Sequence, residues 1–493
     1  MRLQTLLHSF GVSPYDSTHE VDLSLQSQLL GPKTPSPVVP SAFPALLPPC
    51  SNADAMNPTI PRLFLGIVLC LSATAFAADP WRSPSPQQID AIYPQMRALY
   101  EDLHRNPELS LHEEKTATKI ADQLRKLGYE VTTGVGNTGV VGVLKNGAGP
   151  TVMIRAELDA LPVLEKTQLP YASHATTHND QGIEVPIMHA CGHDLHMSVG
   201  MGTAALLAQN KDRWHGTFIY VGQPAEERIQ GASAMLKDGL FTRFPRPDYA
   251  FAIHDTSFAP AGAVNYVSGF AMSNADSLDV TIYGKGGHGS APELTIDPVV
   301  IAARTILAWQ TIISREKNPQ DPGVITVGTI HGGTKNNIIP DEVKLQLTVR
   351  SYKDDVRQHL LSAIERVVDG EAAAAGAEKK PTVTRVETVN AVYNDPAMTQ
   401  RVVGALESVL GKENVVSFRP NMASDDFAEY ARTGVPSVML NLGAVNPAKF
   451  AAAQKSGEAL PGPHSSLFAP EEEPSLKTGI LVETTAVLEL LGK

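Results

Sequence analysis

Apolar and polar residues alternate along most of the chain with the periods of helices and strands. Apolar residues at helical spacing predict helices at 85–109, 113–127 and 198–208. Short apolar runs predict strands at 130–133, 140–144, 151–155 and 216–221. Alternating strands and helices are typical of an α/β sheet covered on both faces. We therefore expect the first part of an α/β catalytic domain, with a central sheet flanked by helices, over residues 85–274.

Residues 275–390 follow a different order of elements. Strands are predicted at 277–283, 323–329, 343–350 and 382–389, and helices at 297–313 and 354–368. The order β-α-β-β-α-β is that of a ferredoxin-like unit of the α+β class. The α/β pattern returns over residues 391–493 and ends in a helix predicted at 477–491. The simplest arrangement is one discontinuous catalytic domain with a smaller domain inserted into it.

The N-terminal part of the chain has no such period. Residues 1–55 hold eight prolines and few charges, so we expect them to be disordered or to come from an over-extended reading frame. Residues 56–78 contain Arg62, an apolar run at 63–71 and the small-residue sequence Ala75–Ala77, which is the pattern of a secretory signal peptide. A short N-terminal anchor is the alternative, but the run is too short for a comfortable membrane span.

These features predict an exported protein, periplasmic or secreted, with no stable membrane span after processing. Its 493 residues provide for more than one domain, and a formal net charge of −12 argues against nucleic acid as a partner. Cys50 and Cys70 would be removed with the leader, so Cys191 would be the one cysteine of the mature chain. A single thiol retained in an oxidising compartment suggests a chemical role, and metal binding would protect it.

The densest group of chemically active residues lies at Met188–His196, which holds three histidines, an aspartate and Cys191. Cys191 and His193 flank a glycine that permits a tight turn, and together they form a plausible half of a divalent-metal site. The alternative is a polar loop with satisfied histidines. Further ligands of the right type occur at Glu226, Glu227, His254 and His464. If the site is real, His464 has to return in space to Cys191.

Motifs from about residue 90 to the C-terminus give the chain a family resemblance. They are Arg155–Pro162, Met188–His196, Gln223–Glu227, Gly284–His288, Asn337–Pro340, Asp425–Phe427 and Pro463–Ser465. With these motifs in this order, the chain resembles the zinc aminoacylase and carboxypeptidase family of metallopeptidases. Within that family it is similar to the amidohydrolase branch of hippurate hydrolases, indole-acetyl-amino-acid hydrolases and N-acyl-amino-acid deacylases. The resemblance implies a catalytic α/β domain with an inserted lid, which often mediates dimerisation, so a homodimer is expected.

The resemblance also implies two adjacent divalent metal ions. Their ligands would be Cys191, His193, Glu227, His254 and His464. Two ions about 3.5–4 Å apart can activate a water molecule and stabilise a tetrahedral intermediate. Thiolate and imidazole ligands suit Zn²⁺, although Mn²⁺, Co²⁺ or Ni²⁺ could bind as well. After His254 the family pattern has an apolar residue, whereas this chain has Asp255.

Other residues receive roles through the same resemblance. Glu226 is assigned as general base and acid, although a pair of solvated loop carboxylates is the alternative. His288 resembles a lid histidine that stabilises the oxyanion, in dimers that of the other subunit, and otherwise is an exposed loop residue. Asn337 resembles a residue that holds the substrate carbonyl or carboxylate. Arg350 is expected to pair with a free carboxylate, or else is a surface residue of its strand.

The expected activity is therefore metal-dependent hydrolysis of the amide bond of N-acyl amino acids, a small-molecule substrate. A dipeptidase or carboxypeptidase of the same family is the alternative within enzymes. A metal-binding protein that has lost catalysis is the alternative from a different class. Glu226 argues against that last interpretation, because a protein that merely binds metal has no need of the additional carboxylate beside Glu227.

Overall fold

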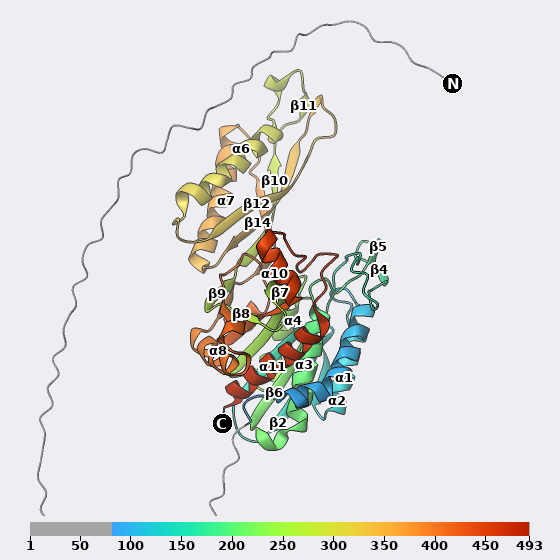
Figure 1. Cartoon of the computed structure of the whole chain (residues 1–493). Helices are drawn as coiled ribbons and strands as arrows, with labels where there is room; N and C mark the ends of the chain where they lie inside the picture. Colours follow the sequence, from blue (N-terminus) through green and yellow to red (C-terminus); the bar gives the residue numbers. More distant parts are fainter. Residues whose placement is uncertain (1–80, 493) are drawn as a thin grey trace, which may run out of the picture. The chain divides into compact units, whose positions relative to one another are not determined.

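The structure is a computed structural model that describes residues 81–492 (Figure 1). The segments expected at 1–55 and 56–78 lie outside the described residues, so the signal peptide stays a prediction. Within residues 81–492, none of the helices combines the length and apolar character that crossing a membrane requires.

A mixed sheet of eight strands organises the larger part of the chain. Its order is β1 (Glu130–Val135), β2 (Gly139–Asn146), β6 (Gly216–Gln223), β3 (Thr151–Glu157), β7 (Tyr249–Pro260), β18 (Ser437–Val445), β8 (Val264–Tyr266) and β17 (Val415–Ser417). The four central strands β6, β3, β7 and β18 run parallel, with Ile154 opposite both Tyr220 and Phe251. Strands buried on both faces read as continuous apolar runs, as the sequence of β3 does.

Helices cover both faces of this sheet and enclose two apolar cores. The first face carries α1 (Pro86–Arg105), α2 (Glu114–Lys126), α3 (His193–Gln209), α8 (Pro396–Leu410) and α11 (Glu472–Leu491). The second face carries the shorter helices α4 (Gly231–Lys237), α5 (Leu240–Arg243) and α9 (Ala428–Arg432). Helix α3 is almost entirely buried and apolar on all sides, as expected for a helix packed between the sheet and other helices.

Several helices begin at a residue whose side chain accepts hydrogen bonds from the first turn, followed by a proline. Ser85 caps α1 in this way and Asp395 caps α8. Asp297 caps α6 (Pro298–Thr311), and Asn446 caps α10 (Pro447–Ser456). Proline is favourable at the first helical position because its missing N–H would have no partner there and its φ is already helical.

The inserted domain is a four-stranded antiparallel sheet with two helices and its own apolar core. The strand order is β12 (Gly323–Gly332), β14 (Glu342–Ser351), β10 (Asn274–Tyr283) and β15 (Thr382–Val389). Helices α6 and α7 (Asp354–Ala374) pack on it through Trp309 and Leu360. In chain order the strands stand 2-3-1-4, which is the ferredoxin-like arrangement. The expected α/β class with an inserted α+β domain is confirmed.

Short elements complete the fold. Two-stranded ribbons pair β4 (Thr176–His178) with β5 (Glu184–Pro186), β9 (Gly269–Met272) with β16 (Val392–Asn394), and β11 (Gly287–His288) with β13 (Ile338–Ile339). Single helical turns lie at Lys211–Arg213, Pro292–Leu294, Ile312–Glu316 and Lys412–Asn414. Several boundaries differ from the sequence expectation: α3 begins at His193 instead of 198, α11 begins at Glu472 instead of 477, and α7 ends at Ala374 instead of 368. The sequence did not predict helices α4, α5, α8 and α10.

Candidate active site

One cavity of about 1150 Å³ lies at the carboxyl ends of the central parallel strands. This edge is where open α/β sheets place their ligands. Six of the predicted site residues line it, namely Cys191, Glu226, Glu227, His254, Arg350 and His464. His193 is fully buried directly beside them. The cavity therefore brings together residues from distant parts of the chain.

Cys191 and His193 lie on either side of Gly192, the N-cap residue of α3. Gly192 between them has φ +77°, a left-handed conformation that glycine adopts without steric cost. The Nδ1 of His193 lies 2.8 Å from the backbone oxygen of Asp159 and donates to it. Its Nε2 is buried and has no hydrogen-bond partner among the described residues. This tautomer leaves the Nε2 lone pair free to bind a ligand.

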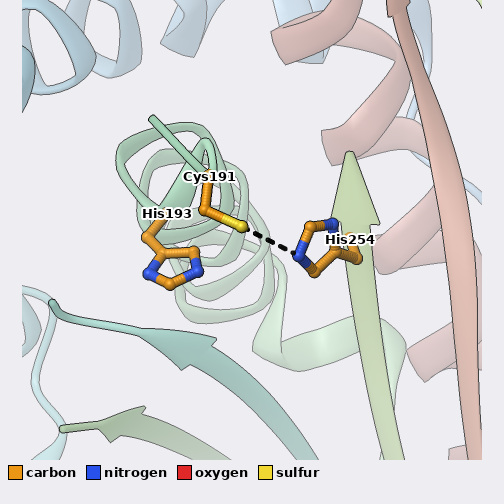
Figure 2. A group of neighbouring side chains, drawn as sticks. All are labelled: Cys191, His193 and His254. Atoms are coloured by element: carbon orange, nitrogen blue, oxygen red, sulfur yellow. Dashed lines mark hydrogen bonds between the residues drawn. The ribbon is translucent and has the colours of Figure 1, made fainter. Parts of the chain in front are cut away.

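His254 reaches the same place from strand β7. Its Nδ1 lies 2.8 Å from the backbone oxygen of Asp255, and its Nε2 lies 3.5 Å from the Sγ of Cys191. Figure 2 shows the sulfur directed at the His254 ring, with His193 on the same side of the helix as Cys191. Burial, and then the neighbouring His196, lower the pKa of His254. The neutral imidazole that results is the form that binds metals.

Glu226 and Glu227 lie in the loop that follows β6. Burial, followed by the negative charges of Asp425 and Glu227, raises the pKa of Glu226 well above its ordinary value. A raised pKa increases the proton affinity of this carboxylate, which favours a role as general base. The loop is held in an uncommon backbone conformation, since Ala225 and Ile229 have φ values of 47° and 56°. Such conformations concentrate at functional sites.

His464 comes from the loop after α10 and meets Glu227. Its Nε2 lies 3.3 Å from Oε2 of Glu227, and its own φ is 69°, again left-handed. The His464 N–H donates to the backbone oxygen of Ala190, which ties this loop to the turn that carries Cys191. The predicted return of His464 to Cys191 is therefore seen in the structure.

Among the groups of ligand-type atoms in the cluster, two share Cys191. In the first, Cys191, His193 and His254 each offer an atom within 4.8 Å of the others. In the second, Cys191, Glu227 and His464 meet the same criterion. Sulfur, imidazole nitrogen and carboxylate oxygen are the donors that Zn²⁺ and similar ions take in proteins. This shared cysteine is the geometry expected of two adjacent ion sites.

A buried ionic network lies behind this cluster. The guanidinium of Arg155, in β3, pairs with Glu157, with Asp425 at 2.7 Å and with Asp426 at 3.1 Å. Glu157 in turn accepts from Nδ1 of His196 at 2.9 Å. Buried charges are stable only when paired and hydrogen-bonded, which this network achieves. It fixes the loop at 425–426 to the central sheet.

Asp159 and Asp194 hold the ligand-bearing segments from the other side. Oδ2 of Asp159 accepts from Ser110 and from the Glu227 backbone N–H. Asp194 lies 2.6 Å from Nδ1 of His104, whose Nε2 lies 3.1 Å from Glu165. Burial alone would lower the pKa of His104, but the two carboxylates raise it to about 10. The charged His104 therefore anchors the first turn of α3.

Of the three predicted lid residues, Arg350 lies at the cavity, whereas His288 and Asn337 lie on the surface. Arg350 is half-buried, lines the cavity and donates to the backbone oxygen of Met422 at 2.6 Å. Among the described residues, no carboxylate forms an ion pair with it. His288 and Asn337 do not line this cavity; both are exposed on the β11–β13 ribbon, where Gly289 N–H donates to Asn337 O. The single chain therefore does not bring these two to the cluster.

Apolar side chains form another wall of the cavity. Phe258 and Phe418 are stacked, with ring centroids 6.0 Å apart and an interplanar angle of 25°. Phe258 is 62% exposed, which is unusual for phenylalanine. Helix α10 contributes Phe450, and the loop after it contributes Leu460. Sequence analysis did not single out these residues, because no spacing relates them before the chain is folded.

Comparison with known proteins agrees with the family resemblance that the motifs indicate. Residues 153–460 match the peptidase family M20/M25/M40. Thermostable carboxypeptidase 2 of Saccharolobus solfataricus is 36% identical over 79% of this chain and 94% of its own length. Hippurate hydrolase of Campylobacter jejuni is 36% identical over 69% of this chain and 86% of its own length. The solved YXEP protein of Bacillus subtilis, titled a dinuclear metal binding peptidase from the M20 family, has a TM-score of 0.66 at 28% identity and covers 81% of this chain and 99% of its own.

The chain belongs to the M20/M25/M40 peptidase family. The resemblance inferred from the motifs is thereby confirmed, and the protein is a hydrolase of that family.

Proposed function

We propose that this protein hydrolyses the amide bond of N-acyl amino acids at the Cys191 cavity, with two divalent metal ions bound there. The observation that carries the proposal is the pair of ligand groups sharing Cys191. The hippurate hydrolase relative supports the reaction class, and the similarity to the YXEP protein, a dinuclear metal binding peptidase, supports two ions.

The residues present fit such ions. Nε2 of His193 and Oε1 of Glu227 are buried without a hydrogen-bond partner among residues 81–492, and both face the cluster. Leaving buried polar atoms unpaired is costly, and a cation between them would remove that cost. Burial raises the pKa of the Cys191 thiol, so a cation would also favour its thiolate. A thiolate with imidazoles favours Zn²⁺, and Mn²⁺, Co²⁺ or Ni²⁺ could replace it.

When bound, the ions would supply Lewis acidity that polarises the substrate carbonyl and makes water easier to deprotonate. The protein's own part in the reaction is proton transfer. A carboxylate oxygen of Glu226, which lines the cavity, takes a proton from the attacking water and returns it to the leaving amine. Glu226 has to reach the water first and the leaving amine afterwards. Burial and the negative charges of Asp425 and Glu227 raise its proton affinity, so it can accept the proton from water and then donate it to the amine.

Arg350 and Asn337 are proposed to hold the substrate. The Arg350 guanidinium lines the cavity without a carboxylate partner among the described residues, so a free carboxylate of the amino-acid part can pair with it. Asn337 would act from the lid ribbon. The apolar wall made by Phe258, Phe418 and Phe450 suits a bulky apolar group better than an acetyl group, because aromatic rings stack favourably at such surfaces.

We also propose a homodimer in which His288 serves the partner's cavity. His288 does not line its own cavity, and its Nδ1 accepts from Ser290 N–H at 3.1 Å, which fixes the ring on the ribbon. Exposed apolar residues on the inserted domain, including Val300, Leu307 and Ile330, provide a surface that a second copy would cover. An imidazole supplied from a lid can stabilise a developing oxyanion.

The test is a substrate panel with the Zn²⁺-loaded protein. We expect hydrolysis of N-benzoyl and N-acetyl amino acids, loss of activity after chelation and recovery on adding Zn²⁺ back. Cys191→Ser should lower metal content and activity together, as measured by elemental analysis. A metal-loaded protein that leaves every N-acyl amino acid intact would refute the proposed activity.

A carboxypeptidase is the second candidate, because the carboxypeptidase of Saccharolobus solfataricus is as similar to this chain as the hippurate hydrolase is. Both activities would use the same ion cluster, and both substrates carry a free carboxylate for Arg350. N-blocked dipeptides in the same panel separate the two activities. Release of their C-terminal residue with no hydrolysis of acetyl-amino or benzoyl-amino acids would establish the second candidate.

A further inference from the structure

Asp255 follows His254 in strand β7. The proposed reaction gives no role to its carboxylate. The side chain is only 1% exposed, and neither of its oxygens has a hydrogen-bond partner among the described residues. It also lines the cavity. A buried unpaired carboxylate is unfavourable unless a nearby group uses its charge.

Asp255 faces the ring of His254 on the side away from Cys191. Its Oδ1 lies 3.5 Å from Nδ1 of His254, whereas the other ring nitrogen, Nε2, faces the Cys191 sulfur at 3.5 Å. The Nδ1 proton is already donated to the Asp255 backbone oxygen at 2.8 Å. The carboxylate thus adds negative charge beside a proton whose position is fixed.

The surroundings hold this carboxylate in place. A Cβ at Gly192 would lie 1.9 Å from Oδ2 of Asp255, so the carboxylate occupies the space that only a glycine leaves open. The Asp255 backbone N–H donates to Nε2 of His196 at 2.9 Å, while Nδ1 of His196 donates to Glu157. His196 Nε2 already accepts from this backbone N–H and lies 3.5 Å from Oδ1 of Asp255, so it forms no hydrogen bond with the carboxylate.

A separate cation site at His196, His254 and Asp255 is excluded by the same hydrogen bonds. The three side chains are close enough to hold an ion. However, Nε2 of His196 accepts from a backbone N–H, and Nδ1 of His254 donates to a backbone oxygen. Neither nitrogen has a lone pair left for a cation. The charge of Asp255 consequently acts through the His254 ring.

We propose that Asp255 is a positioning residue that strengthens metal binding by His254. A carboxylate on the Nδ1 side holds the ring in the tautomer that offers Nε2 and makes that nitrogen a stronger donor. The ion that is bound more tightly as a result is the one next to Cys191 and His254. The inference rests on the proposed function only in taking the Cys191 cluster as the metal site.

The experiment measures the dissociation constants of Zn²⁺ from the full chain by competition with a chromophoric chelator. Asp255→Asn removes the charge and keeps the shape, and Asp255→Leu restores an apolar residue. Both variants should bind one of the two ions roughly 10–100-fold more weakly than the unmodified chain. Glu483→Gln is the matched control, because Glu483 is also a buried carboxyl group with an unpartnered oxygen, outside the cavity, and its replacement should leave both constants unchanged.

A second readout uses Co²⁺, whose absorption reports on thiolate and imidazole ligation. We expect a weaker Co²⁺ titration for Asp255→Asn, with thermal unfolding of the chelated protein no more altered than in Glu483→Gln. Zn²⁺ constants of Asp255→Asn equal to those of the unmodified chain would overturn the inference. If the unmodified chain binds two ions but cleaves no amide, the proposed function fails and this inference stands. If it binds none, both fail.

Discussion

Nε2 of His464 lies 3.3 Å from Oε2 of Glu227, although the two residues come from the two separate segments of the catalytic domain. Their meeting closes the second ligand group around Cys191. Because the inserted domain lies between them in sequence, the site exists only when both parts of the catalytic domain are folded together. The chemistry therefore depends on the packing of β6, β7 and β18 in one parallel sheet.

Glu226→Gln should retain both ions and lose turnover. The amide cannot take a proton from water, and positioned general bases contribute roughly 10²–10⁴-fold to rates. Turnover of an N-benzoyl amino acid, measured together with metal content, checks this. The control is Glu458→Gln, an exposed carboxylate of the same cavity that contacts none of the ligand residues. If Glu226→Gln had activity near that of the control, Glu226 would not be the general base.

His104→Gln should destabilise the protein more at low pH than at high pH. The pKa of His104 is raised from 6.5 to about 10, so its pairing with Asp194 and Glu165 stabilises fully below about pH 6.5 and is lost as pH rises through about 10. Removing one partner of a buried ion pair costs about 3–5 kcal/mol. Urea unfolding across this range measures the difference from the unmodified chain.

The same series on His215→Gln, an exposed histidine, provides the control and should show little change at any pH. A free-energy difference for His104→Gln that stays constant from about pH 6.5 to pH 10 would contradict a charged His104.

Phe258→Ala should change the preference between benzoyl and acetyl substrates more than it lowers activity on all substrates. Removing one ring of the stacked pair with Phe418 takes away a surface for a large apolar group, a contact worth about 1–3 kcal/mol, or roughly 10-fold or more in kcat/KM. Acetyl substrates, too small to reach it, should be much less affected. Val386→Ala, on an exposed strand of the lid, serves as control. Equal losses for benzoyl and acetyl substrates would show that the wall does not select the substrate.

Mixing two inactive variants tests whether the lid histidine acts across a dimer. Glu226→Gln and His288→Ala should each be inactive alone. In a mixed dimer, the cavity with an intact Glu226 receives His288 from the other subunit. Random reassortment of a two-fold dimer then restores about a quarter of the unmodified activity. No recovery, with mixed dimers demonstrated by tagging, would place His288 in its own cavity or outside catalysis.

Much of this fold could be predicted from local pattern. The sequence alone shows the apolar runs of β3 and β6 and the order of elements in the inserted domain. Helix α10 was missed because its alanine-rich sequence has no apolar period, although Asn446 and Pro447 at its start are a helix N-terminal signal. Four of the five ligand-type residues lie in a short motif, namely Cys191, His193, Glu227 and His464, whereas His254 lies in none of them.

Residues that act through packing could not be found in the same way. His104 contacts Asp194 only because α1 packs against α3, and no spacing in the sequence records that contact. The aromatic wall is assembled in the same manner from Phe258 of strand β7, Phe418 after strand β17 and Phe450 of helix α10. Asp255 did give a signal, as an acidic residue where an apolar one was expected, but its relation to His254 needed coordinates.

The most direct test of the whole account is a crystal structure of the Zn²⁺-loaded protein with anomalous data collected at the zinc edge. Two peaks should appear in the cavity, both within bonding distance of the Cys191 sulfur, which is about 2.3 Å for zinc and thiolate. One should lie next to His193 or His254, and the other next to Glu227 or His464. A single peak, or peaks that leave the Cys191 sulfur uncoordinated, would contradict the paired-ion site on which the proposed hydrolysis depends.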